Sequence, residues 1–160
     1  MATGTFQQYA RSIDAVSLYD LVNTHTVNCA LVTSSYTPSV GAAAGHYRWA
    51  DVSANEIANG NGYTTGGATL GTKSTAATVA DTGKYFTAAD IVWTASGGNI
   101  PAWRYAVFYI VGTVAGVTNP LLGYVNGDSS LADVPATTDG NALTLDVGST
   151  GIFARVASTT

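Results

Sequence analysis

The side chains that could carry out chemistry in this 160-residue chain are few and widely spaced. The main candidates for nucleophilic catalysis are two histidines, His25 and His46, and a Gly-Asp-Ser-Ser run at residues 127–130. A serine nucleophile needs a base and an orienting acid in a defined geometry, and this run lacks the following glycine and the strand–turn–helix frame of hydrolase nucleophiles. Asp and Ser after Asn-Gly are ordinary turn residues. The sequence therefore predicts a turn here, no catalytic residue, and a protein that is not an enzyme.

Three aspartates, Asp128, Asp133 and Asp139, raise the question of a cation site. Calcium loops place oxygen ligands at alternate positions and end with a bidentate glutamate, and spacings of five and six residues do not match that pattern. The single cysteine, Cys29, excludes an intrachain disulfide and a cysteine-rich zinc site. It lies in an apolar run, where a free cysteine is expected to be buried. We predict no metal and no cofactor, with a cation at the three aspartates as the alternative.

The charge balance excludes further classes of function. Lys and Arg number 6 against 10 Asp and Glu, which gives a net charge of −4, and the basic residues are scattered singly. Nucleic-acid binding draws its affinity from basic patches that release counterions, so we expect no direct binding of DNA or RNA. No apolar run approaches the roughly 18 residues that cross a bilayer, and we expect no membrane association.

Composition also indicates the class of fold. Only 10% of the residues are charged, and Glu56 is the one glutamate, so the chain lacks the residues that normally cover the exposed faces of helices. Short apolar runs alternate with Gly- and Pro-containing turns, which is typical of sandwiches and jelly rolls. The predicted fold is all-β: a jelly-roll-like antiparallel β-sandwich forming a single domain over residues 1–160, with a short N-terminal helix.

The apolar runs locate the expected elements. Residues 103–111 are almost entirely apolar or aromatic, which favours a central strand buried on both faces. Residues 13–22 repeat apolar side chains at roughly helical spacing, with Ser12 as N-cap, inside an N-terminal arm or helix of residues 1–26. Further strands are expected at residues 27–32, 53–58, 68–79, 85–86, 91–93, 121–125, 141–147 and 151–157.

Residues 39–51 do not read as a strand, because three alanines stand between Gly41 and Gly45. Four consecutive aromatic or cationic residues follow, namely His46, Tyr47, Arg48 and Trp49. Glycines give a segment reach, and Tyr, Arg and Trp dominate the energetic centres of interfaces. We therefore predict a flexible arm at residues 39–51 in which these four residues, 46–49, bind a partner. The alternative is that the arm caps one end of its own sandwich.

Six segments can be compared with known proteins. They are residues 30–38 (ALVTSSYTP), 51–57 (DVSANEI), 62–70 (GYTTGGATL), 88–93 (AADIVW), 104–109 (RYAVFY) and 121–125 (LLGYV). In this order and at these spacings they resemble a family of small tailed-phage virion proteins, whose relatives include capsid decoration (cement) proteins. The resemblance extends over about residues 29–153. The chain departs from the family at residues 41–49, 97–101 and 129–141, where we expect the contacts with a partner.

The resemblance implies a virion structural protein. Its expected place is the outer surface of a phage head, where it would contact the major capsid protein as a homo-oligomer, such as a trimer, after synthesis in the host cytoplasm. It carries no catalytic or cofactor-binding residue over to this chain. The first alternative is a tail or head-fibre component that binds a host glycan. The second, from another class, is a secreted carbohydrate-binding module with Trp49, Trp93 and Trp103 in its site; core packing and oligomer contacts are the competing roles for these aromatic residues.

Overall fold

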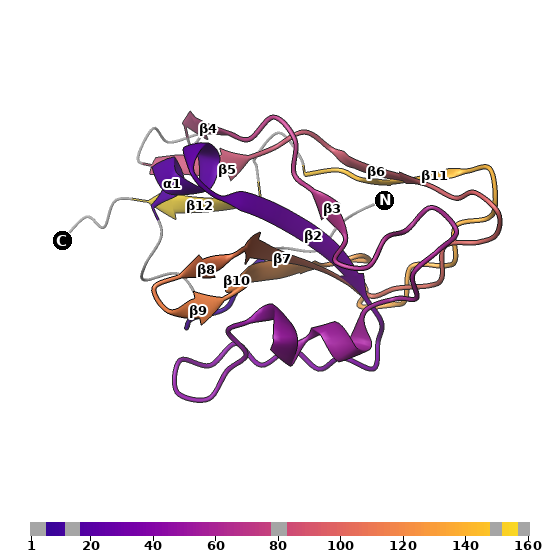
Figure 1. Ribbon diagram of the computed structural model, residues 1–160, viewed down its shortest axis with the longest axis horizontal. Coiled ribbons are helices and arrows are strands. Elements are labelled where there is room, and N and C mark those ends of the chain that lie inside the picture. The colour runs from indigo at the N-terminus through magenta and orange to yellow at the C-terminus, as the bar shows by residue number, and fades with distance from the viewer. Residues whose placement is uncertain (1–5, 12–16, 78–82, 148–151, 157–160) are drawn as a thin grey trace.

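The structure, a computed structural model, describes residues 6–11, 17–77, 83–147 and 152–156. All of the paired strands in these residues run antiparallel to their neighbours, so the predicted all-β class is confirmed. They form one five-stranded sheet, two smaller sheets and a short hairpin. Figure 1 shows the smaller sheets above the large one.

The five-stranded sheet, called the main sheet here, lies at the centre of the molecule. Its order is β1 (Gln7–Gln8), β10 (Leu121–Asn126), β7 (Tyr105–Val111), β2 (Thr26–Val32) and β3 (Ala68–Thr69). β2 and β7 pair along their whole length, from Thr26 opposite Val111 to Val32 opposite Tyr105. Five consecutive residues of β7 are buried, as expected for a strand covered on both faces. The strands predicted at residues 27–32, 103–111 and 121–125 are thus confirmed, with small shifts in their ends.

The smaller sheets form a second layer. One has the order β12 (Phe153–Val156), β5 (Gly83–Thr87) and β4 (Ser74–Ala77), and the other pairs β11 (Ala142–Leu145) with β6 (Ile91–Thr94). β5 and β6 follow one another in the chain, as do β11 and β12, so the β5–β12 and β6–β11 ladders continue the same antiparallel pair. Leu143 and Leu145 of β11 are buried and Ala142 and Thr144 are exposed, which confirms the predicted half-buried strand.

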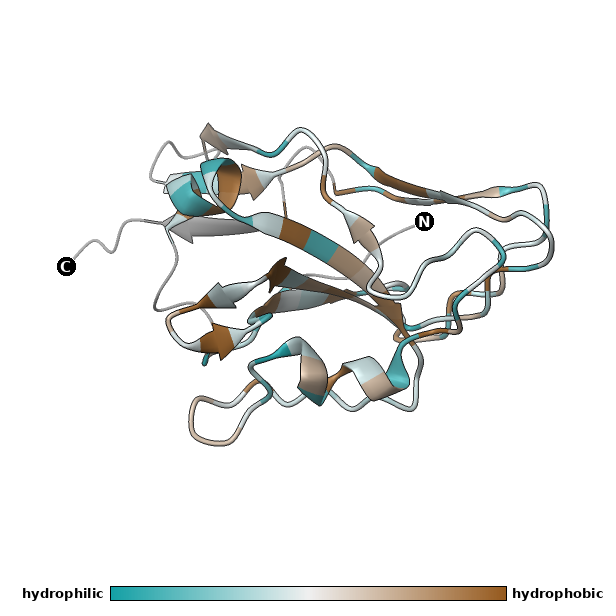
Figure 2. Ribbon diagram, in the orientation of Figure 1, coloured by the Kyte–Doolittle hydropathy of each residue, from teal (hydrophilic) through white to brown (hydrophobic). Residues whose placement is uncertain are grey.

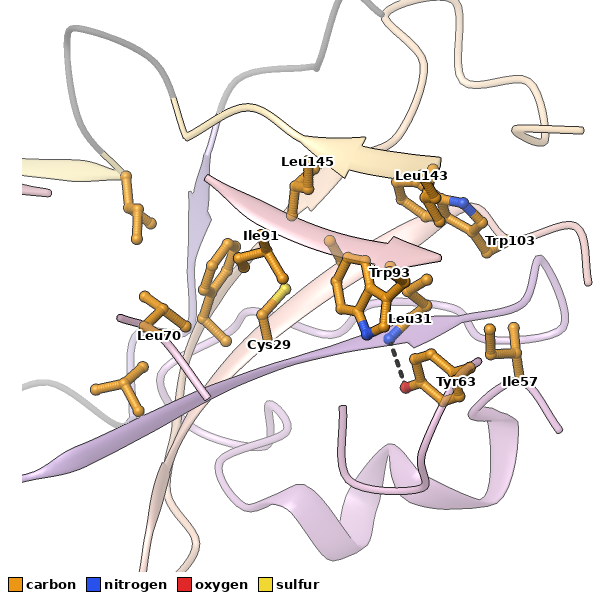
Figure 3. Close-up of a cluster of buried hydrophobic side chains, with 14 of the residues drawn as sticks. Cys29, Leu31, Ile57, Tyr63, Leu70, Ile91, Trp93, Trp103, Leu143 and Leu145 are labelled. Atoms are coloured by element: carbon orange, nitrogen blue, oxygen red, sulfur yellow. Dashed lines mark hydrogen bonds between the residues drawn. The ribbon is translucent and has the colours of Figure 1, made fainter. Parts of the chain in front are cut away.

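The hydrophobic core fills the space between the two layers, which gives the molecule a sandwich-like packing. Alternate residues of the main sheet, such as Cys29 and Leu31, point toward the second layer (Figure 3). They meet Ile91, Trp93 and Leu143 from β6 and β11. The most hydrophobic segments of the ribbon accordingly lie on the strands and the polar ones mainly on the loops (Figure 2). Burial of these side chains stabilises the fold by about 25 cal/mol for each Å² of apolar surface removed from water.

A helix is present within the predicted N-terminal helical segment, of which residues 13–16 lie outside the described residues. α1 (Leu18–Asn23) begins after Ser17, whose hydroxyl accepts a hydrogen bond from the backbone N–H of Asp20 at 3.1 Å. Ser17 is therefore the N-cap of the observed helix; the N-cap predicted at Ser12 lies outside the described residues. The helix packs on the core through Leu21, which is buried.

Two predicted strands differ from the structure. Residues 53–58 do not form a strand: the 3₁₀ helices η1 (Trp49–Asp51) and η2 (Ser53–Asn55) occupy most of this region, and only Glu56 makes an isolated bridge, to Val32. Val52 and Ile57, which flank η2, are both buried. The strand predicted at residues 68–79 is divided between β3 in the main sheet and β4 in the second layer.

Three very short strands were not predicted. β1 has two residues, as do β8 (Thr113–Val114) and β9 (Val117–Thr118), which form a hairpin beside the main sheet. Two-residue strands carry no periodicity, so the sequence gives no pattern by which to find them. The β8–β9 turn contains Gly116 with φ of +79°.

Candidate functional site

The segment after β2, residues 33–57, crosses the face of the main sheet that points away from the second layer, below the sheet in Figure 1, and is called the covering segment here. A second buried cluster lies on this outer face, and it consists of Tyr9, Ala30, Val32, Tyr36, Val52, Val107, Tyr109 and Leu121. Trp49 of η1 covers the cluster by stacking on Tyr109, with ring centroids 4.7 Å apart and planes 8° from parallel. The outer face is therefore an aromatic layer that the chain covers with its own residues.

The predicted arm is attached to this sheet by its backbone. The N–H of Leu121 donates to the carbonyl of Tyr47 at 2.9 Å, and the N–H of Trp49 donates to the carbonyl of Asn119 at 2.8 Å. Residues 47–49 therefore pair by backbone hydrogen bonds with residues 119–121, which lead into β10. These contacts favour the alternative in which the segment covers its own sandwich, although it covers a face rather than an end. Binding of a partner by the same residues stays a prediction.

His46, the first of the four predicted partner-binding residues, is part of a chain of hydrogen bonds. Its Nδ1 lies 2.8 Å from the hydroxyl of Tyr36, which lies 2.7 Å from the hydroxyl of Tyr9. Burial is the main reason why the pKa of Tyr36 is raised to about 12, and burial raises the pKa of Tyr9 still further. Both phenols are thus neutral at physiological pH, and the chain joins the N-terminal segment to the covering segment.

Tyr47 and Arg48, the next two residues, lie at the surface. The guanidinium of Arg11 lies 4.2 Å from the centre of the Tyr47 ring, and that of Arg48 lies 5.4 Å from it. The Arg48 Nε donates to the Asp51 Oδ1 at 3.0 Å. Partial burial raises the pKa of Asp51, but the hydrogen bonds from Arg48 and from the backbone N–H of Tyr47 outweigh this effect and lower the pKa below its usual value. Asp51 thereby fixes the position of both residues.

The structure places the four predicted residues in two settings. His46 and Trp49 are directed at tyrosines of their own fold, through the hydrogen bond to Tyr36 and the stacked contact with Tyr109. Arg48 is exposed and Tyr47 is partly buried, as are His46 and Trp49. Arg48 therefore offers the most side-chain surface to another molecule, and Tyr47 lies beside it in contact with the guanidinium groups of Arg11 and Arg48.

The Gly-Asp-Ser-Ser run forms the predicted turn. The Asp128 Oδ1 accepts hydrogen bonds from the backbone N–H of Ser130 at 2.7 Å and from the Ser130 hydroxyl. In the described part of the chain, neither His25 nor His46 hydrogen-bonds to a serine side chain. The carbonyl of His25 instead accepts a hydrogen bond from the Lys73 ammonium. Asp128, Ser130 and the backbone carbonyl of His25 thus stabilise local structure.

The three aspartates have separate partners. Asp128 closes its own turn, Asp133 pairs with the Arg104 Nε at 2.7 Å, and Asp139 accepts a hydrogen bond from the N–H of Gly97 at 3.0 Å. Within the ranges that the structure describes, no three His, Cys, Asp or Glu residues gather as a metal ion would require.

Two of the three segments in which partner contacts are expected lie together. Residues 97–101 and 129–141 meet at one end of the sandwich, at the right of Figure 1, where Ile100 and Thr137 exchange two backbone hydrogen bonds of 3.0 Å. The Asn61 side-chain amide donates to the carbonyl of Asn99 at 2.9 Å, which adds residues 59–62 to the group. We call residues 59–62, 97–101 and 129–141 the end loops. The third segment, residues 41–49, lies on the outer face.

The tryptophans do not gather on one surface. Trp93 and Trp103 belong to the core between the layers, and their exposed fractions are 5% and 1%. The Trp103 indole Nε1 is buried without a hydrogen-bond partner. Trp49, on the outer face, is half-buried against Tyr109. Packing therefore accounts for all three, and a carbohydrate platform built from them is wrong.

Several residues that organise the site were missed by the sequence analysis. Arg11 contacts Tyr47 across a gap in sequence that leaves no local pattern. Glu56, as the only glutamate beside a Gly-rich stretch, could have been noticed: its Oε1 accepts hydrogen bonds of 2.7 Å from the Tyr63 hydroxyl and from the N–H of Gly66. The Tyr63 hydroxyl in turn accepts a hydrogen bond from the N–H of Leu31 at 3.0 Å (Figure 3).

No known protein family, curated protein or solved structure matches this chain. Within the described residues, no helix has the length and apolar character that a membrane crossing requires. The function must therefore be inferred from the residues themselves and from the way the fold arranges them.

Proposed function

We propose that this protein is a structural component of a tailed-phage virion, most simply a decoration protein that stabilises the head shell. The observation that carries the proposal is where the resembling segments lie. Three of them, residues 30–38, 104–109 and 121–125, supply the end of β2 and most of β7 and β10 in the main sheet. The departing segments lie in the end loops and on the outer face. A shared scaffold with individual contact loops is the distribution expected of proteins that attach to different partners.

The polar groups of the fold also support a structural role. Asp51 and Asp128 accept hydrogen bonds that close their own turns, and Glu56 joins the 56–66 loop to β2 through Tyr63. Such groups hold a scaffold in place. Proteins of this kind work by many weak contacts repeated by symmetry, and attachment at several points makes a modest interface effectively tight. The partner in this proposal is the major capsid protein, and the protein binds it as a homo-oligomer.

Reconstitution on particles tests the proposal. Purified protein is added to heads of the same phage that lack it, and bound copies are counted by cryo-electron microscopy and quantitative gel analysis. We expect copies over the whole shell in a number fixed by its symmetry, and heads that resist heat and dilution better than bare heads. A small number of copies confined to the tail or to fibres would overturn the decoration role in favour of the alternative. Absence of binding to any part of the particle would overturn both.

A further inference from the structure

Two arginines and a tyrosine form a small cationic surface next to the outer face. Arg11 follows β1, whereas Tyr47 and Arg48 belong to the covering segment. Both guanidinium groups contact the same Tyr47 ring, at 4.2 Å and 5.4 Å from its centre. Cations are scattered singly in the sequence, so this pairing is created by the fold.

The local charge at this surface is opposite to that of the whole chain. The net charge of the protein is −4, and the two ion pairs found among the described residues are Arg48 with Asp51 and Arg104 with Asp133. Arg11 has no carboxylate within ion-pair distance in these residues. Asp51 cannot neutralise it as well, since its Oδ1 accepts from Arg48 and its Oδ2 from two backbone N–H groups. An excess of positive charge therefore remains around Tyr47.

The surface is also held in position before any partner arrives. The Tyr47 carbonyl accepts a hydrogen bond from β10, and the Arg11 Nη1 donates to the carbonyl of Gly45 at 3.3 Å. The N–H of Ala10 donates to the carbonyl of Val40 at 3.2 Å, which ties the N-terminal segment to the same loop. Prior ordering lowers the entropy that binding must remove. An arginine stacked on an aromatic ring keeps the N–H groups at its edge directed outward for a planar acceptor.

We propose that Arg11, Tyr47 and Arg48 form a binding surface for carboxylate groups, namely the Asp and Glu side chains of an acidic patch on a protein partner. Guanidinium groups bind carboxylates in paired hydrogen bonds, and a partly exposed tyrosine contributes contact area at low entropic cost. A nucleic acid would meet the net negative charge of the rest of the molecule, whereas a folded partner needs to be acidic only at the contact. That this partner is the shell protein rests on the proposed function; the chemistry of the surface does not.

The direct test uses a short oligoglutamate peptide as the probe. Binding is measured by NMR titration for the intact protein, for Arg11→Gln, for Arg48→Gln and for the control Lys84→Gln, which removes an exposed cation on β5. We expect the peptide to shift the signals of residues 45–48, and each arginine variant to weaken binding about tenfold, as for a central interface contact. Added salt should weaken binding, and the control should bind normally. Arg11→Gln leaves the Arg48–Asp51 pair intact, and the NMR spectrum of the unliganded variant shows whether residues 45–48 keep their structure, which separates a loss of binding from a loss of folding.

Three outcomes would overturn the assignment. The first is no binding of the peptide, and the second is equal loss in the Lys84→Gln control. The third is equally tight binding of a sulfated oligosaccharide or a short DNA strand, which would show a general anion surface. The same variants are then tested on heads. If the protein binds oligoglutamate but no part of the particle, the surface stands and the virion role fails; if wild type and Arg11→Gln bind heads equally, the surface does not face the shell.

Discussion

Four buried tyrosines place their hydroxyl groups at points where segments distant in sequence meet. Tyr9 and Tyr36 join the N-terminal and covering segments, Tyr63 connects Glu56 with β2, and Tyr109 donates to the carbonyl of Gly66 at 2.7 Å. Burial is the main cause of the raised pKa of each of these phenols. Each side chain fills the interior as a hydrophobic ring and satisfies a polar group at its end, which is why a chain with few charges can use so many tyrosines.

These tyrosines predict a loss of stability in alkaline solution. The folded protein raises the pKa of Tyr36 from 10.0 to about 12, so the neutral form is favoured in the folded state. The stabilisation is complete below about pH 10 and is lost as the pH rises toward 12. We expect the midpoint of urea unfolding to fall over this range, and to fall less in Tyr36→Phe. A midpoint independent of pH, or the same slope in the variant, would contradict the assignment.

The candidate site shows how far single residues can be predicted from sequence. Composition was enough to single out residues 46–49, because Tyr, Arg and Trp after a glycine- and alanine-rich stretch need a contact of some kind. It could not show which of the four side chains pack on their own fold. His46 contacts Tyr36 and Trp49 contacts Tyr109, and the contact with Tyr109, distant in sequence, forms only in the folded sheet. Arg48 is exposed and Tyr47 lies beside it, partly buried and in contact with Arg11, which is also distant in sequence.

At the scale of elements, the long strands were predictable and the short connections were not. β2 is mostly apolar and β7 is a nearly continuous run of β-branched and aromatic residues, so their burial follows from composition. The strand expected at residues 53–58 is instead occupied by η2, which follows directly after η1 and Val52. The Asp51 carboxylate accepts hydrogen bonds from the backbone N–H groups of Tyr47 and Arg48 and so fixes η1. A contact of this kind between side chain and backbone leaves no periodic pattern in the sequence.

The turn before β3 gives a prediction about Gly67. Its φ is +74°, and an added Cβ would lie 2.0 Å from the carbonyl oxygen of Cys29 in β2. Gly116 in the β8–β9 turn has a similar φ of +79° but open space around it, which makes it a matched control. Gly116→Ala should lower the free energy of unfolding by about 1 kcal/mol through backbone strain alone. Gly67→Ala should lower it by ~3 kcal/mol, because β3 must also move away from β2.

Chemical denaturation of the two variants measures the difference. The far-UV circular dichroism of the folded state serves as the check that both retain their strands. Equal losses of unfolding free energy at the two positions would mean that the contact with Cys29 is relieved without cost.

At the scale of the molecule, the main sheet has a hydrophobic cluster on each face. Cys29 and Leu31 face the second layer, whereas Ala30 and Val32 face the covering segment. Both clusters therefore share the backbones of β2 and β7, and neither can lose its packing without exposing the other. We expect the molecule to unfold as one cooperative unit that includes residues 36–57.

Tryptophan fluorescence can test this cooperativity. Replacing Trp93 and Trp103 with Phe leaves Trp49 as the reporter of the outer face, and Trp49→Phe leaves the two reporters of the core. In each variant, the fluorescence transition should coincide with the circular dichroism transition, even if the substitutions lower the midpoint. A Trp49 signal that changes at lower denaturant than the strands would show that the covering segment detaches by itself, as the flexible-arm hypothesis requires.

The pairing of β2 with β7 has a consequence for the synthesis of the protein on the ribosome. β2 ends at Val32, but its central partner begins only at Tyr105. A ribosome that adds about 5–20 residues per second leaves this apolar strand without its partner for roughly 4–15 s. Antiparallel sheets built from such distant segments also close slowly once the chain is complete, in about milliseconds to seconds. An apolar strand that is largely buried in the finished sheet is therefore exposed for seconds to chaperones and to neighbouring nascent chains.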